Sequence, residues 1–197
     1  MATARPGTLA HHLFTMACNN AWANHRLLAA CAGLTDSEFA ATRTSFFPSI
    51  RHTLNHIVTV DWMYVDAIER AFAGQPPHPR IGAFYEPEVP FATLPPLSEA
   101  QHAVDARLIA VCQGLQEGDV DHPVGILRRD GVNTETAQRL LAHLFQHQIH
   151  HRGQVHAMLA GTSVAPPQLD EFFCANEAHL RARELAELGL SEAAIWS

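Results

Sequence analysis

Four long stretches of the chain repeat apolar residues at the spacing of an α-helix. Apolar side chains three or four positions apart lie on one face of a helix, and Pro and Gly mark several of the boundaries. The predicted helices cover residues 8–33, 48–74, 98–114 and 134–161, the last capped by Asn133 or Thr134. Because each has an apolar face to bury, the chain is expected to be all-α.

The predicted architecture is a four-helix bundle with a long crossover connection between its second and third helices. That connection, residues 75–97, is rich in Pro and is the longest in the chain. It joins two halves of one domain in our interpretation, because neither half alone could bury its helices. Residues 1–197 are thus expected to form a single domain, with the core bundle at 8–161 and a C-terminal extension at 162–197.

Shorter elements are expected between and after the long helices. Thr35 to Glu38 has the pattern of a capping box, in which a first-turn Glu bonds back to the residue that caps the helix. A hairpin is indicated around residues 124–127, since the Asp130-Gly131 pair that follows is a strong turn signal. A last amphipathic helix is expected at about residues 180–188.

The charge, the apolar runs and the cysteine spacing argue against several classes of protein. The net charge of −7, with histidine neutral, argues against a nucleic-acid partner, which would require a basic patch. No apolar run is long enough to cross a membrane, and the N-terminus lacks the apolar core of a secretory signal, so a cytoplasmic protein is expected. The cysteines lack zinc-type spacing, and we interpret all four as reduced core residues: Cys18, Cys31, Cys112 and Cys174.

Histidine is the unusual component of this chain, with 14 residues against 13 Lys and Arg together. His143, His147 and His151 follow one another at four-residue spacing in the fourth predicted helix, which places neighbours on one face. Two imidazoles at this spacing can bind one metal ion from a rigid element, and His56 in the second helix is the best candidate for a third ligand. The predicted ligands are His56, His147 and His151, for Zn, Ni, Fe or Mn, all of which accept imidazole.

Other interpretations of these histidines stay open at this point. His52, His143 and His150 are rival ligands because each lies within about one turn of the favoured set. His143 and His151 diverge by about 80° at roughly 100° per residue, so all three residues of that stripe are not expected to share one ion. A pair at four-residue spacing also arises by chance in a histidine-rich chain, and the rings are then half-buried polar residues.

Several polar residues accompany the histidines. Arg152 follows the last predicted ligand, and either a buried ion pair or a solvated side chain is compatible with its position. Asn20, Trp22 and Asn24 in the first helix are candidates to line the same cavity. For Trp22, packing in the core is the more common role of such a residue.

Three segments in this order resemble the DinB family, including its YfiT-like members. They are Asn-Ala-Trp-Ala-Asn at 20–24, the segment 49–62 with His56 and a closing Asp-Trp, and His-Gln-Ile-His-His-Arg-Gly-Gln at 147–154. The pattern H-x-x-x-H-R-G-Q in the last segment is the most specific. Together the segments span most of residues 9–160.

The resemblance implies a long-crossover four-helix bundle, often a homodimer, with a three-histidine metal site. Carried onto this chain, the ligands match His56, His147 and His151, which demotes the three rivals. It further implies a divalent-metal-dependent enzyme, and relatives include S-transferases and isomerases that use low-molecular-weight thiols such as bacillithiol or mycothiol. No catalytic residue beyond the ligands is assigned.

The expected activity is therefore transfer or hydrolysis, in which the metal acidifies a thiol or a water molecule. The expected partners are a small-molecule substrate, such as a low-molecular-weight thiol, and a second copy of the chain, with no nucleic acid and no membrane. The alternative is a non-catalytic metal-binding or small-ligand-binding protein, or a stress-response protein acting as a homodimer. A third hypothesis gives the cluster a stabilising role alone.

Overall fold

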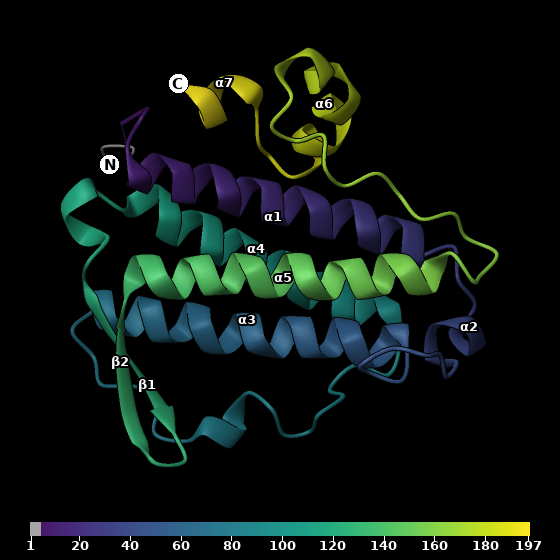
Figure 1. The fold of residues 1–197 in the computed structure, drawn as a ribbon, viewed down its shortest axis with the longest axis horizontal. Coiled ribbons are helices and arrows are strands. Elements are labelled where there is room, and N and C mark those ends of the chain that lie inside the picture. The colour runs from purple at the N-terminus through teal and green to yellow at the C-terminus, as the bar shows by residue number, and fades with distance from the viewer. Residues whose placement is uncertain (1–4) are drawn as a thin grey trace.

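Four long helices lie side by side and form the body of the protein (Figure 1). The computed structural model describes residues 5–197, apart from the side chain of Ile81. The long helices in this range are α1 (Leu9–Cys31), α3 (Ile50–Phe72), α4 (Leu94–Gly114) and α5 (Ala137–Leu159). Both α1 and α3 pack against α4 and α5. Most of the described residues are helical, which confirms a mostly helical fold.

Local hydrogen bonds explain where α1 and α3 begin. The side-chain oxygens of Thr8 and Ser49 accept hydrogen bonds of 3.2 Å from the backbone nitrogens of His11 and His52. These bonds satisfy donors that the first turn of a helix leaves free. The predicted starts of these two helices are confirmed, as is the capping box that opens α2 (Asp36–Ala40).

The third long helix begins earlier than predicted. α4 starts at Leu94 instead of residue 98, with Pro95 and Pro96 in its first turn. Proline costs no hydrogen bond there, because the first backbone nitrogens of a helix have no partner within it. The connection from α3 therefore covers residues 73–93, and the predicted loop at 75–97 was too long.

The predicted hairpin is present and is longer than expected. β1 (Pro123–Arg128) pairs in antiparallel register with β2 (Gly131–Thr136). Gly131 has a φ of +129°, a conformation that favours glycine at the turn. Because β2 includes the residues predicted to cap the fourth helix, α5 begins at Ala137 instead of residue 134. The hairpin packs against α3 through β1.

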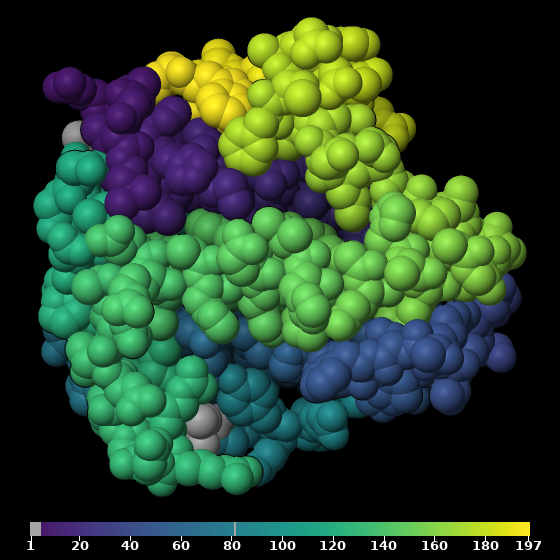
Figure 2. Space-filling view, in the orientation of Figure 1, coloured from purple at the N-terminus to yellow at the C-terminus, as the bar shows by residue number. Residues whose placement is uncertain are grey.

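The C-terminal extension lies over α1 (Figures 1 and 2). It contains α6 (Ala178–Glu187), which the sequence predicted, and α7 (Glu192–Trp196), which it did not. Arg26 on α1 forms ion pairs with Glu171 and Glu184 of the extension, so charge as well as apolar contact holds this segment. Three short 3-10 turns complete the described elements: η1 (Ile81–Ala83), η2 (Glu117–Asp119) and η3 (Ala175–Glu177).

A layer of buried polar side chains separates two apolar clusters in the core. One cluster includes Trp22, Val58, Leu108 and Leu144, and the other includes Leu27, Ile50, Leu97 and Val155. All four long helices contribute to this polar layer, which comprises Asn20, Asn24, Asp61, Gln101, Asp105, Gln148 and Arg152. Two of these helices, α3 and α5, also carry the histidines, so the polar layer is described together with the functional site below.

The cysteines are free thiols, and three of them are buried. Cys174 in the extension is exposed, so the prediction that all four lie in the core is wrong for this residue. Burial raises the pKa of Cys18 and Cys31 to about 12, which keeps these thiols protonated at neutral pH. Among the described helices, none combines the length and apolarity needed to cross a membrane.

Candidate metal centre

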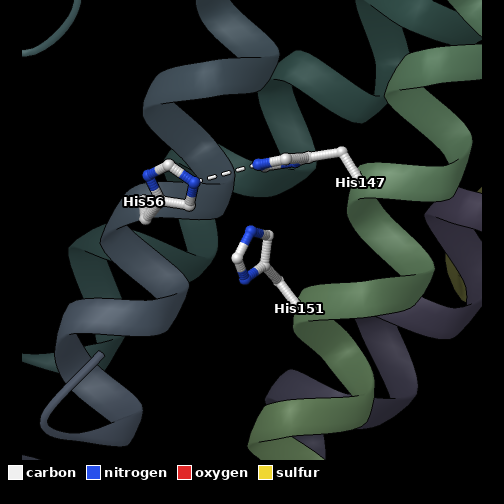
Figure 3. Close-up of side chains that lie close together, drawn as sticks. All are labelled: His56, His147 and His151. Atoms are coloured by element: carbon white, nitrogen blue, oxygen red, sulfur yellow. Dashed lines mark hydrogen bonds between the residues drawn. The ribbon is translucent and has the colours of Figure 1, made fainter. Parts of the chain in front are cut away.

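Three imidazole rings converge between α3 and α5 (Figure 3). His56 projects from α3, and His147 and His151 project from successive turns of α5. Nε2 of His56 lies 2.9 Å from Nε2 of His147, and one ring nitrogen from each residue lies within 4.8 Å of the others. The structure thus brings together the three residues that the sequence singled out.

The cluster is shielded enough from water to keep its rings neutral. Phe47 covers one side, with its ring centroid 4.4 Å from that of His56 and 5.6 Å from that of His151. Burial, with the neighbouring imidazoles adding to it, lowers the pKa of His56 to about 4 and that of His147 to about 3. Burial also lowers the pKa of His151. Neutral imidazole is the form that binds a metal ion.

Hydrogen bonding leaves lone pairs directed into the cluster. Nδ1 of His151 lies 2.8 Å from Oε1 of Gln154, and since this oxygen can only accept, Nδ1 carries the proton and Nε2 keeps its lone pair. Nδ1 of His147 is buried and has no hydrogen-bond partner among the described residues. In the contact between His56 and His147, one Nε2 donates to the other. A shift of that proton to Nδ1 of its own ring would leave both Nε2 lone pairs free for a cation.

This donor set fits a divalent metal ion. Zinc–nitrogen bonds of about 2.0–2.1 Å in a tetrahedral site place two ligand nitrogens roughly 3.3 Å apart, so small ring rotations reach that spacing. Three neutral imidazoles suit Zn, Ni, Fe or Mn. An ion held by these three ligands alone, the set found among the described residues, would have a fourth position for water or substrate, as in catalytic sites.

The rival histidines lie outside this cluster. Nδ1 of His52 contacts Oγ of Ser49 at 2.8 Å in the first turn of α3. His143 is exposed and its ring packs near Tyr64, with the centroids 5.4 Å apart. His150 is exposed as well, and its Nε2 lies beside the Gln154 amide. His52 and His143 share a helix face with His56 and His147 but lie one turn further along the axis, whereas His150 leaves α5 at a different angle from its neighbour His151.

Arg152 lies in the buried polar layer. Its Nη1 donates to Oδ1 of Asn20 at 2.5 Å and to Oδ1 of Asn24 at 3.0 Å. The sequence left open a buried ion pair or a solvated side chain. Among the described residues Arg152 is in neither state, because it is buried and its hydrogen bonds go to amide oxygens. Burial lowers its pKa to about 10, opposed by the charges of Asp105 and Asp61, and it stays a cation at neutral pH.

Two buried carboxyl groups face this cation from α4 and α3. Asp61 accepts hydrogen bonds from Gln101 and Gln148, while its Oδ1 has no partner among the described residues. Burial raises the pKa of Asp105 to about 6. Burial and the nearby Asp105 raise the pKa of Asp61 to about 8. A protonated Asp61 beside an ionised Asp105 balances the single charge of Arg152.

Sequence reasoning missed Gln101 and Asp105 as members of this layer. The available signal was a pair of polar residues at buried positions of the third predicted helix. Asn20 and Asn24 were expected to line the histidine cavity, and they donate to Asp105 instead. Trp22 is a fully buried core residue, in agreement with its more common role.

Comparisons with known proteins bear on the family and the fold. The family model described as the DinB family matches residues 9–184. A search of curated protein sequences found no match. The fold is similar to the crystal structure of a DinB-like protein from Bacillus cereus, with a TM-score of 0.54 and 15% sequence identity over 75% of this chain and 90% of that chain. At this identity the likeness concerns the fold alone.

Proposed function

Since this chain belongs to the DinB family, we propose that it binds one divalent metal ion through His56, His147 and His151 and that it is a metal-dependent enzyme. The supporting observation is the convergence of three neutral imidazoles from two helices, with ring nitrogens within 4.8 Å of one another. Buried polar nitrogens without partners are costly, and Nδ1 of His147 has no hydrogen-bond partner in the part of the chain that the structure describes. A cation shared by the three rings would offset part of that cost.

The proposed reaction is the transfer of a small-molecule thiol to an electrophile. A metal ion held by three imidazoles would act as a Lewis acid and lower the pKa of a bound thiol or water molecule. Gln154 holds the tautomer of His151, and Phe47 excludes water from one side of the rings. All four cysteines of the chain have raised pKa values, which favours a nucleophile supplied from solution.

Finer features of architecture and assembly belong to the same proposal. The packing of α1 and α3 against both α4 and α5 supports a four-helix bundle with residues 73–93 as its long crossover. One domain with a core at 8–161, a homodimeric assembly and a cytoplasmic location are expectations of the family resemblance and the sequence. The family resemblance and the sequence are also the basis for expecting a low-molecular-weight thiol as substrate and no nucleic-acid partner.

Metal content after purification tests the site. The wild-type chain is expected to carry about one equivalent of metal, and His56→Ala and His151→Ala are expected to lose it. The matched control is His143→Ala, an exposed histidine on α5 that lies outside the cluster, and it should retain the metal. A folded wild-type protein that takes up no divalent metal would contradict the proposal.

Turnover separates an enzyme from a metal-binding protein without catalysis. A panel of low-molecular-weight thiols with alkylating and epoxide electrophiles, assayed with and without added metal, should give product only in the metal-loaded wild type. His56→Ala should be inactive, and His12→Ala, at an exposed histidine of α1, should be active. Metal binding without turnover on thiols, esters or amides would favour the non-catalytic alternative.

A further inference from the structure

A polar pocket lies beside the candidate metal centre. It has a volume of about 300 Å³ and lies between α3, the hairpin and α5. Its polar lining consists of Tyr64, Arg128, Asn133, Glu135, Arg139 and His143. Two arginines and a histidine in one open pocket are donors of the type that bind carboxylate or phosphate groups.

Arg128 is the half-buried cation of this pocket. Its Nη2 donates to Oη of Tyr64 at 3.3 Å, and its Nη1 lies 3.6 Å from Sδ of Met63. No carboxylate that the structure describes is in ion-pair contact with it, in contrast to Arg139 and Arg107. A guanidinium presents five donors in a planar fork, so Arg128 retains donors for a ligand.

Arg139 adds a weaker positive charge, which Glu135 opposes. Nη1 of Arg139 lies 3.4 Å from Oε2 of Glu135, and both side chains are exposed. A solvated pair of this kind contributes little stability, so Arg139 is free to turn toward a bound anion. Since Glu135 cancels one of the two arginine charges, the remaining positive charge is that of Arg128.

The pocket and the histidine cluster adjoin each other along α5. The ring centroid of His143 lies 5.4 Å from that of Tyr64 in the pocket and 6.4 Å from that of His147 in the cluster. Four residues separate His143 from His147, which is about 6 Å along the helix axis. The pocket, through His143, therefore lies one helical turn from the nearest histidine of the cluster.

We infer that this pocket binds the anionic group, a carboxylate or a phosphate, of the small substrate whose reactive atom meets the His56–His147–His151 cluster. Arg128 anchors the oxyanion, Tyr64 orients the guanidinium, and Arg139 supplies a second contact. The link to the reactive atom rests on the proposed function, whereas the anion site itself depends only on the pocket. The substrate class is thereby a small organic acid or phosphate ester.

Calorimetric titration of the full chain with succinate and with inorganic phosphate, at constant ionic strength, tests this inference. Both zinc-loaded and metal-free protein are titrated, so that phosphate binding at a metal is recognised. Wild type is expected to bind at least one anion in the metal-free state, and whichever binds more tightly identifies the group. Arg128→Met should weaken binding at least tenfold. Arg129→Met is the matched control, since its exposed neighbouring side chain does not line the pocket.

Two further variants guard against a folding defect in Arg128→Met. Arg128→Lys keeps the charge without the fork, and it should bind the anion more weakly than wild type and more tightly than Arg128→Met. Glu135→Gln should bind more tightly than wild type, because it removes the opposing charge.

The proposed anion site and the proposed metal site can be tested independently of each other. His147→Ala should lose metal and still bind the anion. The inference is overturned if metal-free wild type binds neither anion at millimolar concentration, or if Arg128→Met binds as wild type does. Anion binding in a chain that takes up no metal would retain the pocket and reject the proposed function.

Discussion

Nε2 of His56 and Nε2 of His147 lie 2.9 Å apart, although 91 residues separate them in the chain. One ring belongs to α3 and the other to α5, so the contact exists only because these helices pack together. Both neutral imidazoles can present an Nε2 lone pair to a metal ion once the proton between them has moved to Nδ1 of its own ring, and no proton is then released. The tautomers of these rings, metal binding and helix packing are therefore linked at this pair.

Metal affinity is expected to change little between pH 8 and pH 6. The pKa values of about 4 for His56 and about 3 for His147 mean that protons compete for these nitrogens only in more acidic solution. Ordinary histidines would begin to lose metal near pH 6.5. Chelator competition at pH 6, 7 and 8 measures the affinity. A tenfold loss between pH 7 and pH 6 would show that the rings titrate normally.

Asp61→Asn is expected to gain stability relative to wild type as pH rises. The pKa of Asp61 is about 8 in the folded protein against 3.8 ordinarily, so between these values the unfolded chain releases a proton that the folded chain keeps. Wild-type stability thus falls as pH rises, by up to about 1.4 kcal/mol per pH unit for this group, and asparagine removes that contribution. Urea denaturation of both metal-free proteins from pH 5 to pH 8 measures the difference, and a constant difference would mean that Asp61 is ionised in the fold.

Arg152→Met is expected to destabilise the protein by about 3–5 kcal/mol, because it leaves a buried carboxylate without its cation. Adding Asp105→Asn should recover part of the loss, so the double variant costs less than the sum of the single variants. Denaturation midpoints at pH 7 provide the cycle. The exposed control Arg129→Met should stay within about 0.5 kcal/mol of wild type. Strictly additive effects would argue against coupling between Arg152 and Asp105.

Arg26→Ala is expected to release the C-terminal extension from α1. The change removes the ion pairs to Glu171 and Glu184 and the guanidinium that lies 4.3 Å from the ring centroid of Trp22. Protease cleavage within residues 162–197 should become faster, while metal content stays unchanged because the histidines lie on α3 and α5. Arg183→Ala, at an 85% exposed side chain, is the control. Equal cleavage rates in the two variants would contradict this role of Arg26.

Much of the fold follows from local signals. Apolar periodicity and capping side chains such as Thr8 and Ser49 depend on neighbours within a few residues, so the sequence predicts α1 and α3 nearly to their ends. The starts of α4 and α5 depend on more. Two prolines inside a first turn look like a loop in sequence, and a cap near residue 134 competes with a strand whose partner is formed by residues 123–128.

The candidate site divides in the same way. Spacing along one helix was enough to place His147 and His151 on one face, and His56 was the best third candidate from the residues alone. The family resemblance agreed with this choice and demoted the rivals. The polar layer around Arg152 was not predictable, because a buried Asp105 or Gln101 looks like a solvated residue until its partners on other helices are known.

The sequence by itself determined the helical class, the family and the identity of the clustered histidines, since periodicity and a motif are written along the chain. Only the tertiary structure decided that Arg152 is held by amides and that Arg128 faces a pocket beside His143. It also decided that Asp61 is buried with one oxygen that has no partner among residues 5–197. Such contacts join residues from different elements, and burial by all the surrounding elements sets their energies.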